Sequence, residues 1–366
     1  MNVDTQPPDG TPPHGGDVHH LARTLGVRIA DLVDFSANIN PLGFPPGLPE
    51  AVQAAMADIV HYPDPKSLEL RRDLARYHQV APEEILVGNG STELIYLVVR
   101  ALQPGRALII APCFSEYQKA LEAARVPYDF HLTTEAAGFT LEGPPQASGA
   151  ALIFLANPAS PSGALLPPPR LLPWLAAWDA AGVWVVLDET FIDFVEEASV
   201  KGHLRRLPRL IILRSFTKFF AIPGLRLGYL LAAPEIIDRL AALKEPWSVN
   251  TLAQAAGRVC LQDANFITQS RTLVAEERRY LFEGLRSFQG LTPFPSAANY
   301  LLVKLNRPGW TAARLRGALL FQGLIVRDTS NFKGLDERYF RLAVRGRRDN
   351  DRLLAGLAAC WAGSAA

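Results

Sequence analysis

Four short apolar runs that alternate with amphipathic segments constrain the fold of this chain more than any other feature. The runs are RALIIAP (106–112), ALIFLANP (151–158), VWVVLDE (183–189) and RLIILRS (209–215). Each is rich in strand-forming residues and apolar on both faces, as strands buried in a parallel sheet are. The segments 115–125 and 171–181 between them show helical amphipathic spacing. The alternation predicts an α/β fold with a doubly wound, mostly parallel sheet.

The pattern of apolar residues changes near residue 250. From there, long segments with helical spacing precede three further apolar runs, NYLLVKL (299–305), LIVRD (324–328) and YFRLAVR (339–345). This arrangement predicts a smaller α+β domain, since 366 residues are too many for one simple core. We therefore expect a disordered, proline-rich lead over 1–13 and a segment over 14–48 that packs with the small domain. The large domain is expected over 49–248 and the small C-terminal domain over 249–366.

The net charge and the cysteine content indicate which kinds of ligand and which cellular location to expect. The formal net charge is +1, which argues against a general nucleic-acid footprint and favours a small-molecule ligand. The three cysteines, Cys113, Cys260 and Cys360, are isolated, so we expect no zinc site, no disulfide framework and a cytoplasmic location. No apolar run approaches the length of a membrane span.

A glycine-bearing turn in LVGNGSTELIYLVVRAL (86–102) precedes a predicted helix. Gly90, Ser91 and Thr92 would place backbone N–H groups and two hydroxyls at the start of that helix, where a phosphate can bind. The alternative reading is an ordinary helix cap, because serine and threonine are common at helix starts.

Two strand ends carry the strongest chemical signal. Asp188 ends one apolar run, and Lys218 follows the next in LRSFTKFFAIPGLRLGYLL (213–231), with Ser215, Thr217 and Arg226 close by. The carboxyl ends of parallel strands are where α/β sheets bind ligands. Taken singly, the aspartate is read as a cap and the lysine as a solvated loop residue.

Pyridoxal 5'-phosphate needs this combination of groups. It requires a lysine for a Schiff base, a carboxylate for the ring nitrogen, and donors with positive charge for the phosphate. Phe114, just past a strand end, could stack on the cofactor ring. The alternative for Phe114 is a simple core position.

At this point the sequence resembles the fold-type I pyridoxal-phosphate enzymes, within the group that contains histidinol-phosphate aminotransferase. The similarity lies in SFTKFFAIPGLRLGY (215–229), VVLDETFIDF (185–194), NPASPSG (157–163) and HYPDP (61–65). The resemblance implies that Lys218 and Asp188 are catalytic and that 49–248 binds the cofactor. It also implies a homodimer in which Tyr62 reaches the cofactor phosphate of the neighbouring subunit.

Within that group the sequence is most similar to the threonine-phosphate decarboxylases of cobalamin biosynthesis, through HGGDVHHLARTLGV (14–27), DFSANINPLG (34–43) and NFKGLDERYFRLAVR (331–345). This similarity implies decarboxylation of L-threonine O-3-phosphate to (R)-1-amino-2-propanol O-2-phosphate. Two positions depart from the wider group. Ser160 stands where its turn carries asparagine, with Asn157 three residues early, and Phe191 stands where the aminotransferases carry tyrosine.

Several cations are expected around a phosphorylated amino acid. Arg341 and Arg345 are four apart in a predicted strand, which places both on one face, and Arg327 ends the preceding predicted strand. The alternative is a set of arginines on a solvated face. Further candidates for substrate binding are His14, Asn38 and Lys333.

Two other functions remain open on the sequence. One is an aminotransferase for histidinol phosphate or a similar amine. The other is a cofactor-binding regulator without catalysis, although the sequence has no N-terminal basic helical module of the kind that binds DNA.

Overall fold

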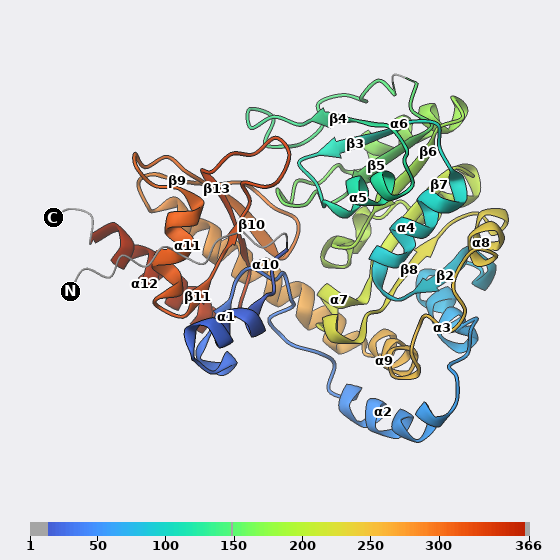
Figure 1. Ribbon diagram of the computed structural model, residues 1–366, viewed down its shortest axis with the longest axis horizontal. Helices are drawn as coiled ribbons and strands as arrows, with labels where there is room; N and C mark the ends of the chain where they lie inside the picture. The colour runs from blue at the N-terminus through green and yellow to red at the C-terminus, as the bar shows by residue number, and fades with distance from the viewer. Residues whose placement is uncertain (1–13, 148, 363–366) are drawn as a thin grey trace.

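A twisted sheet of seven strands forms the centre of the larger part of the molecule (Figure 1). The strand order is β2 (Ile85–Gly88), β8 (Gly228–Leu231), β7 (Leu210–Ser215), β6 (Trp184–Asp188), β5 (Leu152–Ala156), β3 (Ala107–Ala111) and β4 (Tyr128–Leu132). The strand β8 is antiparallel to both of its neighbours, β2 and β7, and the other six strands run in one direction. The structure is a computed structural model that describes residues 14–147 and 149–362, so the predicted lead over 1–13 lies outside it.

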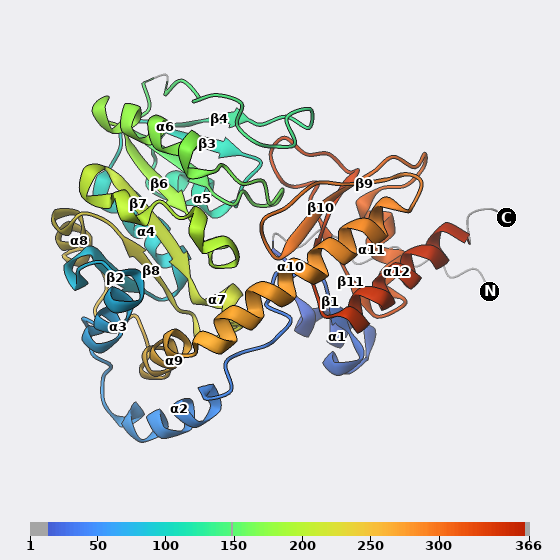
Figure 2. The ribbon, with the colours of Figure 1, turned by 180° about the vertical axis from the view of Figure 1, so that it is seen from behind.

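Helices cover both faces of this sheet, as Figures 1 and 2 show. One face packs against α4 (Gly90–Leu102), α5 (Glu116–Ala123) and α8 (Pro234–Ala241). The other packs against α3 (Leu68–His78), α6 (Pro168–Ala180) and α9 (Thr251–Gln262). The central strands β3 and β7 are buried along their whole length. This confirms the predicted doubly wound α/β arrangement, because each of the four apolar runs became a strand buried between two helical layers.

The smaller part contains a four-stranded antiparallel sheet in the order β12 (Arg327–Asp328), β13 (Tyr339–Ala343), β10 (Tyr300–Leu305) and β9 (Leu291–Pro293). Its helices are α11 (Ala312–Leu320), α12 (Arg347–Ala362) and the long α10 (Ala264–Arg286). At 23 residues, α10 is about 35 Å long. It extends from the large sheet's side to the small sheet and so connects the two parts (Figure 2).

The predicted single strand over 324–328 is wrong. It divides into β11 (Leu324–Ile325) and β12, because its two halves pair with different strands. The first half is parallel to β1 (Val33–Asp34), and the second half is antiparallel to β13. Residues after α1 (Val18–Leu25) therefore join the smaller part before the chain reaches α2 (Leu48–Ala55). None of the helices within the described ranges is both long and apolar enough to cross a membrane.

A buried ionic cluster lies at the carboxyl ends of β6 and β7. Arg214 is fully buried in β7, with its Nη2 donating to Glu196 Oε1 at 2.6 Å. Its Nε lies 3.4 Å from Glu189 Oε2, and its Nη1 lies 3.5 Å from Asp193 Oδ1. All three carboxylates belong to the segment that follows β6. The cluster therefore fixes that segment against the end of β7 and stays stable only while its charges are balanced.

We predict that Arg214→Met lowers the free energy of unfolding by about 3–5 kcal/mol, because it leaves buried carboxylates without their cation. Burial already raises the pKa of Asp193 to about 6 and raises that of Glu189. The charge of Arg214 lowers both pKa values, so its removal raises them further and the variant takes up more protons on folding than the wild type. The loss of stability relative to the wild type should therefore shrink as pH falls from 8 towards 6. Urea unfolding across this pH range measures both effects.

The matched control is Arg205→Met, since Arg205 is exposed and pairs with Glu84 only at 3.7 Å. Arg205→Met should change the free energy of unfolding by no more than about 0.5 kcal/mol. Equal effects of the two substitutions would contradict the stabilising role of the cluster.

Candidate active site

A cavity of about 610 Å³ lies at the carboxyl ends of β5, β6 and β7, where the larger and smaller parts meet. Ligands of open α/β sheets bind at this edge. The residues that line the cavity include nearly all of the predicted cofactor groups together with several of the predicted substrate cations: His14, Asn38, Ser91, Thr92, Phe114, Ser160, Asp188, Phe191, Ser215, Thr217, Lys218, Arg226, Arg327 and Arg341. The fold thus brings together residues that are more than 300 positions apart in the chain.

One end of the cavity is suited to a phosphate. Gly90 begins α4 with φ +78°, and a Cβ on it would lie 2.7 Å from Arg226 Nη2, so the guanidinium lies directly against the start of this helix. Ser215 Oγ and Thr217 Oγ1 lie 2.8 Å apart beside it. Helix N–H groups, hydroxyls and an arginine are the donors that phosphate oxygens require.

Lys218 lies in the short helix α7 (Phe216–Phe219), directly after β7. Burial, together with the positive charges of Arg341 and Arg226, lowers the pKa of Lys218 to about 8. A lysine amine with such a pKa is available as a nucleophile and as a proton carrier near neutral pH.

Asp188 ends β6 in the cavity wall and is held on two sides. Its Oδ1 accepts from the backbone N–H of Thr190 at 2.8 Å, and its Oδ2 accepts from the hydroxyl of Tyr117. Burial raises the pKa of Asp188. Tyr117 was not predicted. It lies in the first turn of α5, three residues after Phe114, and its ring packs edge-on against the Phe114 ring with the centroids 5.9 Å apart.

Asn157 and Ser160, in the turn after β5, have different roles. Asn157 is buried and holds the loop, because its side chain bonds to both the N–H and the carbonyl of Leu166. Ser160 instead lines the cavity, where its Oγ accepts from Arg341 Nη1 at 3.3 Å. Phe191 packs edge-on against Tyr300 at 4.9 Å. Asn157 is therefore a structural residue of this turn, and Ser160 is the polar side chain that faces the ligand space.

Two arginines lie opposite each other on neighbouring strands. Arg327 of β12 pairs in register with Arg341 of β13, and both side chains are nearly buried. Burial lowers the pKa of Arg341 to about 10, and burial together with the charge of Arg341 lowers that of Arg327 to about 10. Arg341 also donates to the carbonyl of Ser36 at 3.1 Å and lies over the Tyr300 ring. A buried pair of like charges is stabilised by an anion that bridges it.

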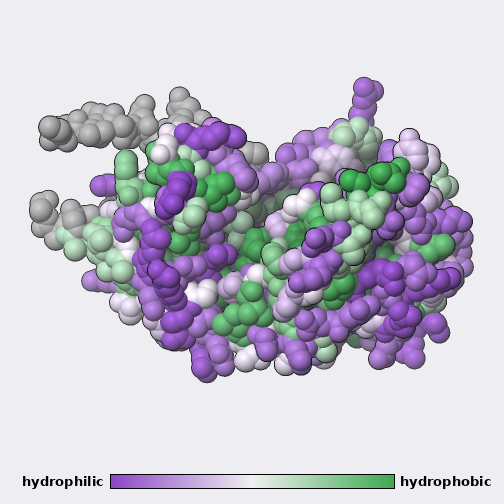
Figure 3. All heavy atoms as spheres, turned by 90° about the horizontal axis from the view of Figure 1, so that it is seen from below, coloured by the Kyte–Doolittle hydropathy of each residue, from purple (hydrophilic) through white to green (hydrophobic). Residues whose placement is uncertain are grey.

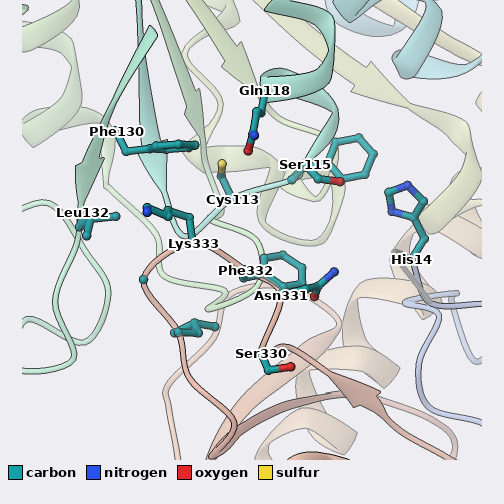
Figure 4. A pocket seen from close by; sticks show the side chains of 13 residues that line it. His14, Cys113, Ser115, Gln118, Phe130, Leu132, Ser330, Asn331, Phe332 and Lys333 are labelled. Carbon is teal, nitrogen blue, oxygen red and sulfur yellow. The ribbon is translucent and has the colours of Figure 1, made fainter. Parts of the chain in front are cut away.

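Three predicted residues lie elsewhere. Arg345 lies two residues beyond the end of β13, 3.5 Å from Asp349, and does not line the cavity. Lys333 lines a second cavity of about 570 Å³, which shares His14, Phe114 and Phe332 with the first (Figure 4). Tyr62 is 80% exposed on the outer surface, where it stacks on Trp247 at 4.7 Å.

The cavity fits the predicted cofactor and a polar ligand. The contact of Gly90 with Arg226 leaves the phosphate end open to backbone donors, since any larger side chain would fill it. Asn38 Oδ1 is buried in the wall without a hydrogen-bond partner among the described residues. Buried polar atoms of this kind are normally satisfied by a ligand or water.

Comparisons with known proteins agree with this geometry. The sequence matches the family described as aminotransferase class I and II over residues 30–357. It is 40% identical to the threonine-phosphate decarboxylase of Salmonella typhimurium, covering 94% of this chain and 95% of that protein. It is 35% identical to a histidinol-phosphate aminotransferase of Anaeromyxobacter sp., covering 94% of each.

The fold is also similar to the crystal structure of L-threonine-O-3-phosphate decarboxylase from Porphyromonas gingivalis, with a TM-score of 0.81. The two chains are 30% identical, over 89% of this chain and 98% of that one. From the sequence match and these similarities, the chain belongs to the family of class I and II aminotransferases.

Proposed function

We propose that this protein is a pyridoxal-phosphate-dependent decarboxylase of L-threonine O-3-phosphate, which forms (R)-1-amino-2-propanol O-2-phosphate for cobalamin biosynthesis. The similarity to two proteins named as decarboxylases of this substrate supports the proposal. The structural observation that carries it is the pair of Arg327 and Arg341 in the cavity. A substrate carboxylate alone does not need two arginines, whereas the oxygens of a phosphate dianion can accept hydrogen bonds from both.

The cofactor supplies, when bound, the electron sink that stabilises negative charge at the substrate α-carbon. Asp188 would hold a proton at the cofactor ring nitrogen, because its carboxylate is buried and fixed by Thr190 and Tyr117. Phe114 lines the cavity beside it and would cover the ring face. The groups that would hold the phosphate are Gly90, Ser91, Thr92, Ser215, Thr217 and Arg226.

Lys218 would carry the cofactor and then act as the proton carrier. After carbon dioxide is lost, its Nζ would deliver a proton to the substrate α-carbon. The pKa of about 8 suits this role, since the protonated and neutral amines are then both populated near neutral pH.

Substrate orientation decides which group leaves the α-carbon. Arginines that bind the remote phosphate fix the rotation of the substrate, so the binding energy of a non-reacting group is used to place the carboxylate for release. Arg327 and Arg341 are suited to this, and His14 and Asn38 line the same space.

A histidinol-phosphate aminotransferase is the second candidate, because a protein of that name is 35% identical over 94% of this chain. Such an enzyme would also use the arginine pair for a phosphate. Analysis of the product separates the two functions, since only the decarboxylase releases carbon dioxide.

We also propose a homodimer in which Tyr62 completes the partner's phosphate site. Apolar side chains around α2 are exposed: Phe44, Met56, Ile59, Val60 and Trp247. Figure 3 looks onto the side from which α2 projects in Figure 1, and apolar patches interrupt the polar surface there. A second copy of the chain would bury such patches. A cytoplasmic location stays a prediction from the sequence.

Lys218→Ala should abolish covalent attachment of the cofactor, because it removes the amine that we assign to this bond. Borohydride reduction followed by peptide mass analysis should label the peptide with residue 218 in the wild type and none in the variant. Lys244→Ala is the matched control, since burial also lowers the pKa of Lys244 although it does not line the cavity. A label on another lysine in the wild type would disprove the assignment.

Arg341→Gln should lower kcat/KM for threonine phosphate by about 100-fold, because charge-assisted hydrogen bonds to the phosphate are lost. The same substitution should change kcat/KM for threonine less than about threefold, since threonine carries no phosphate. Arg345→Gln is the control outside the cavity and should change neither value more than about twofold. Equal losses of Arg341→Gln on both substrates would exclude phosphate binding by this arginine.

Mixing two inactive variants tests the dimer. Tyr62→Ala should weaken cofactor retention, and Lys218→Ala should be inactive. A heterodimer of the two contains one site with Lys218 from one subunit and Tyr62 from the other, so exchange of subunits should restore activity. Restored activity is expected only if Tyr62 acts across the interface. An inactive mixture with proven heterodimers would place Tyr62 in its own subunit's site, and full activity of Tyr62→Ala by itself would place it in neither.

A further inference from the structure

The contact between His14 and Glu116 joins the N-terminal segment to the larger part at the edge of the active-site cavity. His14 Nε2 lies 3.1 Å from Glu116 Oε1, and both residues line the cavity. The His14 ring also lies 5.7 Å from the Phe114 ring. Figure 4 shows the imidazole directed from the N-terminal segment towards the side of the second cavity that carries Ser115. His14 thus lies between the two cavities, and its ring position affects both.

The backbone beside His14 is fixed independently of this contact. A Cβ on Gly15 would lie 2.1 Å from the carbonyl oxygen of Ser36, so the chain passes too closely for any side chain there. Gly16 N–H donates to Ser36 Oγ at 2.9 Å, and the Ser36 carbonyl accepts from Arg341. The backbone therefore places His14 relative to Arg341, while Glu116 sets the orientation of the ring.

Glu116 is itself held firmly. Its Oε1 accepts from Lys119 Nζ at 2.7 Å, and its Oε2 accepts from the Tyr96 hydroxyl at 3.0 Å. Burial alone would raise the pKa of Glu116, but the hydrogen bonds from Lys119 and Tyr96 outweigh it and the pKa lies below its usual value. The carboxylate is therefore ionised and preorganised before any ligand binds.

The charges around His14 oppose one another. Burial lowers the pKa of His14, and the positive charges of Lys119 and Arg327 lower it further. Among the described groups that act on it, the carboxylate of Glu116 favours the imidazolium. A phosphate dianion entering beside Arg327 would also favour the imidazolium, so binding and protonation support each other.

We propose that Glu116 is a positioning residue, which orients His14 and keeps its imidazolium available to bind the substrate phosphate. The proposal rests on the function proposed above. With Nε2 held by Glu116, Nδ1 is the ring nitrogen presented to the ligand. If Glu116 only fastened the N-terminal segment, its loss would lower stability without any dependence on the protonation of His14.

The experiment compares Glu116→Gln with Glu122→Gln in the cofactor-loaded protein. Glutamine keeps the shape and the acceptor oxygen but removes the charge. Glu122 is the matched control because it is exposed on the same helix and accepts from Gln118 and Tyr128. NMR titration of labelled histidines, with the His14 signal assigned by its loss in His14→Gln, should show a pKa of His14 about one unit lower in Glu116→Gln and unchanged in Glu122→Gln.

Binding of inorganic phosphate to the same proteins gives a second readout. The affinity of Glu116→Gln should approach that of the wild type as the pH falls below the His14 pKa values of both proteins. Above both pKa values the dissociation constant should be about tenfold higher, which corresponds to one pKa unit. In a His14→Gln background, Glu116→Gln should have no further effect on phosphate binding.

Lys119→Gln provides a change of opposite sign, because it removes a positive charge and should raise the pKa of His14. This variant keeps the test decisive if Glu116→Gln is unstable. A His14 pKa that does not respond to either substitution, or a loss of phosphate affinity that is the same at every pH, would overturn the proposal. Neither titration requires turnover, so failure of the decarboxylase assignment would be recognised separately.

Discussion

The geometry of the site depends on the ionic contacts that the buried Arg214 makes with three carboxylates. Arg214 is a fully buried residue of β7, and its guanidinium contacts carboxylates of the segment that follows β6. Because side chains alternate along a strand, Arg214 faces away from Ser215, and Glu189 faces away from Asp188. One face of the two strand ends therefore carries the ionic cluster, and the other carries the groups that line the cavity. The separation lets the cavity be polar without weakening the sheet.

The sequence predicted the large sheet because buried parallel strands are apolar on both faces, a pattern that needs no knowledge of partners. It also placed Asp188, Ser215 and Lys218 at one edge, since parallel strands end together. Arg345 was expected beside Arg341, but β13 ends at Ala343. There the backbone N–H of Arg345 is taken by Asn350 Oδ1 instead of a neighbouring strand.

Contacts between distant segments explain the rest of what sequence patterns missed. Glu116 contacts His14, which lies 102 positions earlier in the sequence. No local sequence pattern around either residue predicts this contact. The position of Lys333 depends on the path of the loop between β12 and β13, which places it in the second cavity. Both results come from the packing of the smaller part and the N-terminal segment against α5. The site is therefore assembled by tertiary structure around a core of strand ends that local patterns identify.

The most direct test of the account is the reaction of the purified protein with L-threonine O-3-phosphate in deuterated water, without an added keto acid. We expect carbon dioxide and an amine phosphate that carries one deuterium at the former α-carbon, on a single face, because one fixed lysine delivers the proton. A keto product that forms only when an amino acceptor is present, with no carbon dioxide, would contradict the account.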